Sequence, residues 1–233
     1  MLWTPTPEWK DQDAYIIGGG SSLRAFNFQL LEGLNTIGCN DAFRLGKNVV
    51  KYCMFGDASY FHKMKHQLQA AGMPLITVAP SIEGLNFPDM HCFKRRSSGL
   101  GTGSTCGWNY STGAAAINAA LSLGARRVFL LGIDMNPDEK GRTHWHGHRG
   151  TPTRAAVFDR FQRGFANVHR DHRITFPGTE VIHVLDAPSR LPFFPQMNFK
   201  QLYEHLDQVR NQYGTNQENA EAEGRPVGAV CGA

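Results

Sequence analysis

Hydrophobic positions along this chain form short continuous runs that alternate with segments of helical spacing. The runs are typical of strands that are buried on both faces, and they cover 14–17, 36–39, 49–55, 74–78, 127–131 and 180–185. Apolar residues recur at roughly helical spacing in the segments that predict helices, which cover 23–34, 59–71, 112–123, 153–168 and 198–213. This alternation predicts an α/β fold: a single Rossmann-like domain with a mostly parallel sheet and helices on both faces.

Glycines and a loss of periodicity mark the boundaries of these elements. Gly72 and Gly124 follow two of the predicted helices and predict their ends. The stretch 97–110 is rich in Gly, Ser and Thr, which predicts an irregular loop. The end of the sequence is small, polar and aperiodic, so we expect a domain over 1–213 and a disordered tail over 214–233.

The composition is that of a soluble globular protein. Of the 233 residues, 41% are hydrophobic and 19% are charged. The longest uncharged stretch, 97–125, contains too many Gly, Ser and Thr residues for a bilayer span. The N-terminus lacks the basic start and apolar run of a secretory signal. We therefore expect no membrane segment and a cytoplasmic location.

Cysteines and net charge exclude some classes of protein. The five cysteines are widely spaced and contain no C-x-x-C pair, so we expect buried thiols rather than structural zinc or a disulfide framework. The formal net charge of +4 is too small to indicate nucleic-acid binding by itself. Eight Lys and Arg residues nevertheless face only two acidic residues between positions 140 and 173. This segment predicts an anionic ligand, and a nucleic-acid acceptor is an alternative.

A glycine-rich motif, Gly18-Gly19-Gly20-Ser21-Ser22, connects the first predicted strand to the first predicted helix. Successive amide groups and the positive end of a helix can hold phosphate at such a turn. The motif matches part of the dinucleotide pattern G-x-G-x-x-G, with Leu23 in place of the third glycine, and Asp41 follows the second strand where a ribose-binding acid would lie. We expect nucleotide binding here, and a ligand-free turn is the alternative.

A second polar motif, Ser111-Thr112-Gly113, precedes the alanine-rich helix. It predicts another anion cradle, with a plain N-cap on Ser111 or Thr112 as the alternative. Asp57 and Asp134 each follow a predicted strand and are candidates for holding sugar or ribose hydroxyls. Two cradles on one sheet indicate a nucleotide.

Histidines are concentrated in the segment His144-Trp145-His146-Gly147-His148. A histidine titrates near neutral pH and can take a proton from an acceptor hydroxyl, so we expect a general base here. Imidazoles together with Asp134 could instead bind a metal, but one extended stretch presents at most two of these rings to one point. A hydrogen-bonded surface loop is the third interpretation.

Several of these motifs stand in an order that is familiar: the glycine loop, Cys39-Asn40-Asp41-Ala42-Phe43, Ser111-Thr112-Gly113, Leu130-Leu131-Gly132-Ile133-Asp134, and Gly147-His148. Over about 15–195 the chain resembles the bacterial sialyltransferases that use cytidine monophosphate (CMP)-sialic acid. It is similar, more closely, to a group of uncharacterised phage-encoded proteins with G-G-G-P-S-L, N-D-A-F, L-L-G-x-D-M and H-W-H-G patterns.

The resemblance implies roles for individual residues. The glycine loop and Asn40 would hold the nucleotide, as the matching motifs do in the sialyltransferases. His148 follows a glycine, as the catalytic base of that family does, and would be the base. The tyrosine that follows G-I-D in that family and assists the leaving phosphate is replaced by Met135. A phage origin would place the protein in the host cytoplasm.

Together these features predict a sialyltransferase-like, metal-independent glycosyltransferase. Its donor would be a nucleotide sugar, CMP-linked if the resemblance holds, and its acceptor a hydroxyl of a phage or host glycan or of modified DNA. The expected catalytic residues are His148 and Asp134. The expected nucleotide-binding residues are Gly18, Gly19, Gly20, Ser21, Ser22, Asn40, Asp57, Ser111, Thr112 and Gly113. The expected substrate-binding residues are Arg142, His146 and Arg149.

Two other functions stay open at this point. One is a metal-dependent hydrolase or phosphotransferase that uses His144, His148 and Asp134. The other is a non-catalytic, nucleotide-binding phage assembly protein that keeps the fold without the chemistry.

Overall fold

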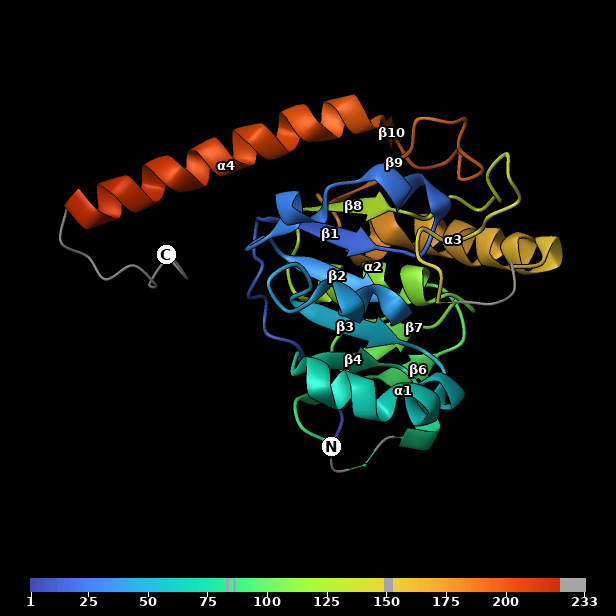
Figure 1. The fold of residues 1–233 in the computed structure, drawn as a ribbon. Coiled ribbons are helices and arrows are strands. Elements are labelled where there is room, and N and C mark those ends of the chain that lie inside the picture. Colours follow the sequence, from blue (N-terminus) through green and yellow to red (C-terminus); the bar gives the residue numbers. More distant parts are fainter. Residues whose placement is uncertain (83, 86, 149–152, 223–233) are drawn as a thin grey trace.

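The structure, a computed structural model, describes residues 1–82, 84–85, 87–148 and 153–222, with the backbone alone over 212–222. Eight strands form one parallel sheet in the order β10-β9-β8-β1-β2-β3-β4-β5 (Figure 1). They are β1 (Asp13–Ile17), β2 (Thr36–Cys39), β3 (Tyr52–Phe55), β4 (Leu75–Thr77), β5 (Met90–Cys92), β8 (Arg127–Leu131), β9 (Glu180–Val184) and β10 (Gln196–Met197). The predicted Rossmann-like α/β fold with a parallel sheet is confirmed.

The chain builds this sheet in two directions from β1. It adds β2 to β5 on one side and then returns to place β8, β9 and β10 on the other. β1 pairs with β8 along its whole length, from Asp13 opposite Arg127 to Ile17 opposite Leu131. Open α/β sheets bind ligands outside the carboxyl ends of their strands at such a change of direction. The junction of β1 and β8 is therefore the place where this fold favours a site.

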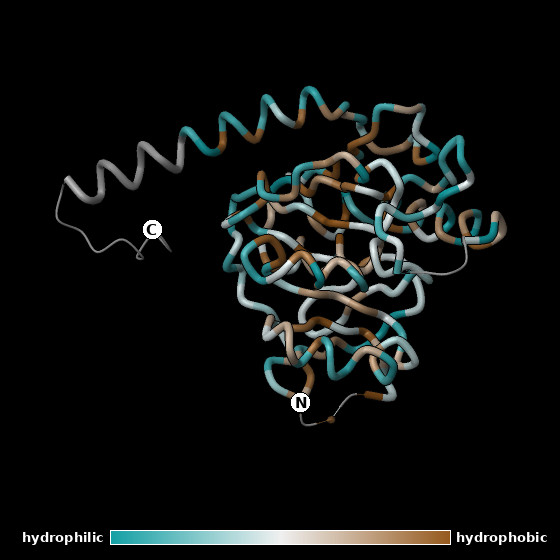
Figure 2. Tube along the Cα trace, in the orientation of Figure 1, coloured by the Kyte–Doolittle hydropathy of each residue, from teal (hydrophilic) through white to brown (hydrophobic). Residues whose placement is uncertain are grey.

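Helices cover both faces of the sheet. On one face, α2 (Thr112–Ser122) and α3 (Ala155–Thr175) pack against side chains such as Ile16 and Val128. On the other face, α1 (Ala58–Ala71) and α4 (Phe199–Ala222) pack against side chains such as Ile17 and Phe129. Successive residues of a strand point to opposite faces, so a sheet with helices on both faces needs strands with apolar side chains on both sides. These strands run through the middle of the domain in Figure 2.

Most predicted elements are confirmed, with shifts at their ends. Gly72 ends α1 in a left-handed conformation, with φ 61° and ψ 33°, and Gly124 follows α2 with φ 94°. α3 continues to Thr175, and α4 continues to Ala222, so the tail predicted over 214–233 begins within this helix and otherwise lies outside the described residues. In the described part of the chain, no helix has both the length and the apolar character needed to cross a membrane.

The prediction of one helix over 23–34 is wrong. This stretch forms two short 3-10 helices, η1 (Ser21–Ala25) and η2 (Phe28–Leu31). Phe26 and Asn27 between them are extended, and the Asn27 side chain accepts a hydrogen bond from the amide of Gln29 at 3.1 Å. Asparagine competes for backbone amides in this way and favours caps over helix interiors. The apolar spacing indicates which residues face the core but does not fix the type of helix, and two short 3-10 helices also bury Leu23 and Leu31.

The loop predicted over 97–110 is partly regular. It contains β7 (Thr105–Gly107), which pairs in parallel with β6 (Lys94–Arg96) to form a separate two-stranded sheet. β6 consists of Lys-Arg-Arg and therefore carries none of the apolar alternation from which strands are recognised.

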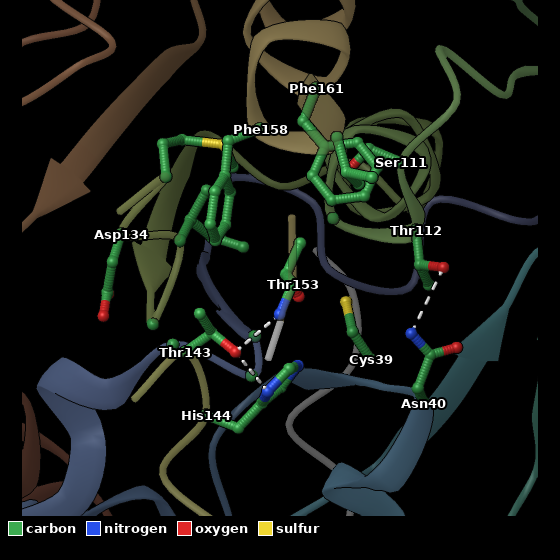
Figure 3. A pocket seen from close by; sticks show the side chains of 18 of the residues that line it. Cys39, Asn40, Ser111, Thr112, Asp134, Thr143, His144, Thr153, Phe158 and Phe161 are labelled. Atoms are coloured by element: carbon green, nitrogen blue, oxygen red, sulfur yellow. Dashed lines mark hydrogen bonds between the residues drawn. The ribbon is translucent and has the colours of Figure 1, made fainter. Parts of the chain in front are cut away.

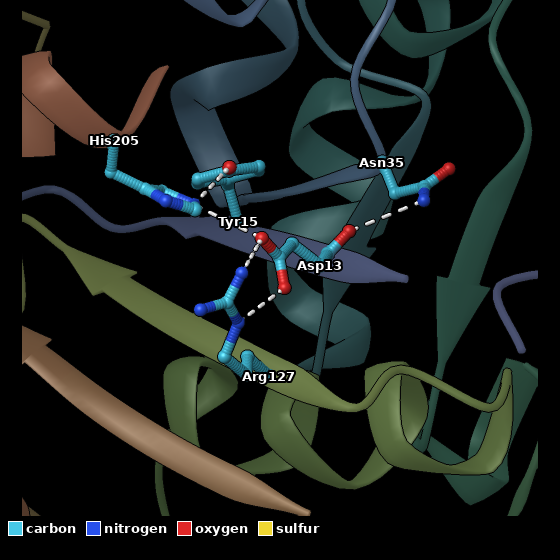
Figure 4. Close-up of polar contacts among 5 residues, drawn as sticks. All are labelled: Asp13, Tyr15, Asn35, Arg127 and His205. Atoms are coloured by element: carbon cyan, nitrogen blue, oxygen red, sulfur yellow. Dashed lines mark hydrogen bonds and ion pairs between the residues drawn. The ribbon is translucent and has the colours of Figure 1, made fainter. Parts of the chain in front are cut away.

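A partly buried ion network joins three elements at the amino end of the central strands (Figure 4). The Arg127 guanidinium donates two hydrogen bonds of 2.7 Å to the Asp13 carboxylate. His205 Nε2, from α4, lies 3.0 Å from an Asp13 oxygen and 3.2 Å from the Tyr15 hydroxyl. Burial alone would raise the pKa of Asp13, but hydrogen bonds from His205 and Arg127 outweigh it and lower that pKa. The network fastens α4 to β1 and β8.

Asp13→Asn should lower the free energy of unfolding, by about 1–3 kcal/mol, because it leaves a partly buried Arg127 without its counter-ion. Urea denaturation measures this. The matched control is Asp159→Asn, whose carboxylate lies 3.2 Å from Arg190 but is exposed, so the loss there should stay within about 0.5 kcal/mol. Equal losses for the two variants would contradict the special role of the Asp13 network.

The same comparison has a predicted pH dependence. A carboxylate whose pKa is lowered in the folded state contributes stability above its unfolded pKa, about 3.9 for aspartate, and loses it as pH falls through the folded value. The difference in unfolding free energy between wild type and Asp13→Asn should therefore shrink as the pH falls below about 4. A difference that stays constant or grows below that pH would contradict the assignment.

Candidate active site

A cavity of about 430 Å³ opens at the carboxyl ends of the strands, at the junction of β1 and β8 (Figure 3). Its walls come from the loops after β1, β2, β3 and β8, from the start of α2, and from one face of α3. The α3 residues Phe158 and Phe161 lie on one side, and Thr143 and His144 lie on the opposite side. The size and position are those of a site for a small organic ligand.

The glycine loop allows the end of β1 to approach the end of β8. The Gly18 amide donates to the Leu131 carbonyl at 2.8 Å, and the Gly20 amide donates to the Gly132 carbonyl at 2.7 Å. A Cβ on Gly18 would lie 2.4 Å from the Gly132 oxygen. Among the described residues, the Gly19 amide has no hydrogen-bond partner, and Gly19 lines the cavity. Gly18 and Gly20 therefore let the loop pack against the end of β8, and the Gly19 amide is available to a ligand.

Asp134 occupies the position where the sequence predicts a phosphate. Its carboxylate accepts hydrogen bonds from the Ser22 amide at 2.8 Å, the Ser22 hydroxyl at 2.6 Å and the Ser21 hydroxyl at 3.3 Å. Burial raises the pKa of Asp134, although these hydrogen bonds oppose the rise. Asp134 lines the cavity as expected, but Ser21 and Ser22 bind the chain's own carboxylate and do not line it. Their predicted role in nucleotide binding finds no support in this geometry.

Trp145 fixes the histidine segment to the glycine loop. Its amide donates to the Gly19 carbonyl at 2.9 Å, and its indole nitrogen donates to the Gly18 carbonyl at 3.0 Å. The indole ring also lies against Phe28, with 4.9 Å between ring centroids. The histidines on either side of Trp145, His144 and His146, both line the cavity, and their ring centroids are 5.4 Å apart.

His144 is the histidine that the structure orients most completely. Its Nδ1 lies 2.9 Å from the Thr143 hydroxyl oxygen, which also accepts a hydrogen bond of 3.0 Å from the Thr153 amide (Figure 3). The Thr143 side chain is buried, so this contact fixes the orientation of the imidazole. His144 Nε2 would lie 3.8 Å from a Cβ on Gly19, so this nitrogen lies beside the glycine loop.

His148, the base expected from the resemblance, lies elsewhere. It is exposed and does not line the cavity, and its ring stacks on His146 with 5.4 Å between centroids. Within the segment 144–148, where the sequence predicts a general base, His144 and His146 line the cavity, whereas the resemblance implies His148. The pattern of alternating histidines gave no signal for choosing between them, because the choice depends on Trp145 docking against Gly18 and Gly19.

The start of α2 is both an N-cap and a possible donor surface. The Ser111 hydroxyl accepts a hydrogen bond from the Ala114 amide at 3.4 Å, so the N-cap interpretation is confirmed for Ser111. The Asn40 amide group donates to the Thr112 hydroxyl at 3.5 Å. Within the described part of the chain, the amides of Thr112 and Gly113 have no acceptor, as expected for the first turn of a helix. Both residues line the cavity.

Carboxylates at the ends of β2 and β3 complete the polar wall. Asp41 is buried, and Arg44 lies 3.8 Å from its carboxylate, whereas Asp57 is exposed at the cavity edge. Asn40 and Met135, which also line the cavity, have left-handed backbones with φ of 51° and 58°. Residues other than glycine adopt this conformation at a cost and often do so at functional sites.

Arg142, one of the two arginines predicted to bind substrate, does not line this cavity. Arg142 donates from Nε to Asp138 at 2.6 Å and lines a second cavity of about 460 Å³, together with Ser21 and Ser22. Its charge is therefore compensated by a neighbour. Arg149 lies outside the described residues. The arginine that does line the first cavity, Arg160, was not singled out by sequence reasoning.

Four cysteines, Cys39, Cys53, Cys92 and Cys106, are buried, as predicted, and Cys231 lies outside the described residues. Cys39 lines the cavity, and burial raises the pKa of its thiol to about 12. A thiol with that pKa is not a nucleophile at neutral pH.

The metal alternative does not fit the geometry. Within the described ranges, no three His, Cys, Asp or Glu side chains are placed to hold a metal ion. Asp134 directs its carboxylate to Ser21 and Ser22, and His148 lies outside the cavity that contains His144.

No family model and no curated protein matches this sequence. Among solved structures, the sialyltransferase CstII from Campylobacter jejuni, in complex with the substrate analogue cytidine-5'-monophosphate, is similar at 14% identity and a TM-score of 0.48. The match covers 79% of this chain and 84% of that protein. A likeness at this level carries no argument about the activity of this chain.

Gly20→Ala should lower the free energy of unfolding by about 2 kcal/mol or more, because the new Cβ would lie 2.4 Å from the Asp134 carboxylate. Chemical denaturation measures the loss. Gly147→Ala is the control, since no atom lies within 4 Å of its Cβ position. If the two substitutions have the same effect, Asp134 is not seated against the glycine loop as described.

Proposed function

We propose that this protein is a nucleotide-sugar-dependent glycosyltransferase. The observation that supports the proposal is that residues with unpartnered backbone amides and a histidine with an oriented imidazole line the same cavity at the junction of β1 and β8. Amides of this kind bind phosphate, and an imidazole can accept a proton from a hydroxyl. The motifs shared with CMP-sialic acid-dependent sialyltransferases point to the same class of reaction.

The nucleotide would bind across the carboxyl ends of β1, β2 and β3. The amides of Thr112, Gly113 and Gly19 are the available donors for its phosphate. Asn40 and Asp57 lie at the ends of neighbouring strands, where side-chain oxygen and nitrogen atoms can bond to ribose or sugar hydroxyls. The proposed donor is CMP-linked, on the strength of the motif resemblance.

His144 is the base in this proposal. In the tautomer with its proton on Nδ1, donated to the Thr143 hydroxyl oxygen, Nε2 is the nitrogen that accepts a proton. Nε2 takes the proton of the acceptor hydroxyl while the acceptor oxygen forms a bond to the anomeric carbon. The bond from that carbon to the donor's phosphate oxygen breaks, and the electron pair leaves with the nucleotide. Backbone amides stabilise the charge that develops on the leaving phosphate. No step requires a metal ion.

A nucleotide should raise the melting temperature of the protein, and EDTA should not reduce the effect. Binding to the folded state stabilises it by about 2.7 kcal/mol at a ligand concentration of 100 Kd. We expect a larger shift with CMP than with cytidine, because the cavity amides address the phosphate. Differential scanning fluorimetry with mono- and diphosphates of each base measures this.

Two results would contradict the proposal. One is the absence of a shift with any nucleotide, which would exclude a nucleotide-sugar donor. The other is a melting temperature that falls with EDTA alone, which would favour a metal-dependent enzyme.

His144→Ala should lower the release of CMP from CMP-sialic acid by about a hundredfold or more, because it removes the base. The Kd for CMP, measured by calorimetry, should change by less than about twofold, since the amides that hold the phosphate are untouched. His148→Ala is the matched control, and its exposed ring predicts a rate close to wild type. A large loss in His148→Ala with little effect in His144→Ala would assign the base to His148 instead.

A further inference from the structure

Arg160 is the basic residue that the structure brings to the cavity. It lies on α3, and among the cavity-lining residues that the structure describes it is the one Lys or Arg. Its guanidinium carbon lies 5.7 Å from the centroid of the Tyr110 ring, within the range of a cation–π contact. Tyr110 immediately precedes the α2 N-cap and is half-exposed at the cavity.

No carboxylate among the described residues pairs with Arg160. Nearby arginines have carboxylate partners: Arg142 bonds to Asp138, Arg170 to Asp171, and Arg190 to Asp159. In the described ranges, Arg160 has neither an ion pair nor a hydrogen bond. A guanidinium at a cavity with its donors unused is suited to an anion that offers two neighbouring oxygens, such as a carboxylate or a phosphate.

The position of Arg160 over Tyr110 is fixed by close packing one helical turn away. A Cβ on Gly164 would lie 2.2 Å from the Asn109 carbonyl oxygen, so only glycine lets α3 approach this loop so closely. The Asn109 side chain holds the loop by accepting from the Gly99 amide at 2.7 Å and donating to the Gly99 carbonyl at 2.8 Å. Both Asn109 and Tyr110 have left-handed backbones, with φ of 51° and 58°. The loop and helix are thus packed so that Tyr110 stays beneath Arg160.

We infer that Arg160, supported by the Tyr110 ring, binds an anionic group of the cavity ligand, a phosphate or a carboxylate, beside the amides at the start of α2. The anion site does not depend on the proposed transferase activity. Only the identification of the ligand as a nucleotide sugar rests on that proposed function. Within that activity, Arg160 would select donors by their charge, either at the nucleotide phosphate or at a carboxylate on the transferred sugar.

The test compares wild type with Arg160→Gln, Arg160→Lys and the control Arg163→Gln, a neighbouring exposed arginine of α3 outside the cavity lining. The probes are inorganic phosphate, cytidine, CMP and CMP-sialic acid, with binding followed by NMR titration and calorimetry. Arg160→Gln should weaken at least one anionic probe by about tenfold or more and leave cytidine unchanged. The affinity of Arg160→Lys for that probe should lie between those of wild type and Arg160→Gln. The affinities of Arg163→Gln should equal those of wild type.

The pattern of losses identifies the anion. Weaker binding of CMP and inorganic phosphate places Arg160 on the phosphate, whereas weaker binding of CMP-sialic acid alone places it on the sugar carboxylate. If wild type binds inorganic phosphate through Arg160 but no nucleotide, the proposed transferase function fails and the anion site stands. Equal affinities of wild type and Arg160→Gln for every anionic probe, or no binding of any of them by wild type, would overturn the inference.

Discussion

The contact between Asp134 and the glycine loop is the constraint on which the site depends. It joins the end of β8 to the end of β1, the two strands at which the chain changes direction across the sheet. Because the buried carboxylate binds at the start of η1, Gly20 can carry no side chain, and the amide of Ser22 is no longer available to a phosphate. Trp145 donates hydrogen bonds to the Gly18 and Gly19 carbonyls of the same loop, and this places the neighbouring His144 at the cavity. The glycine loop therefore holds Asp134 at the cavity wall and, through Trp145, positions His144, the proposed base.

The other groups that line the cavity lie in separate places according to their chemical type. The unused amides lie at the start of α2, the carboxylates lie at the ends of β2 and β3, the imidazoles lie on the Trp145 segment, and aromatic side chains and a guanidinium come from α3. A nucleotide sugar presents the matching groups: a phosphate, sugar hydroxyls and a reacting carbon to which an acceptor must be delivered with its proton removed. These groups suit the proposed transfer from a charged donor, and the Cys39 thiol, whose pKa burial raises, adds no nucleophile.

Sequence patterns predicted the parts of this protein that follow from local periodicity. The buried strands, the ends of α1 and α2 at Gly72 and Gly124, and the importance of the loops after β1 and β8 could all be predicted, because continuous apolar runs and glycines have local causes. The partners of these loops could not. That Asp134 would occupy the Ser22 amide, or that Arg160 would lie over Tyr110, depends on contacts between segments far apart in the sequence. The helix expected over 23–34 failed for a related reason, since apolar spacing identifies the buried side but not the type of turn.

The most direct test of this account is a crystal structure of the protein with CMP. The account predicts the nucleotide in the cavity between Gly19 and the start of α2, with phosphate oxygens within hydrogen-bond distance of the amides of Thr112 and Gly113 and the ribose beside Asn40. It also predicts that the Asp134 carboxylate stays on Ser22. A nucleotide bound in the second cavity beside Arg142, or one that displaces Asp134 to bind at the start of η1, would contradict it.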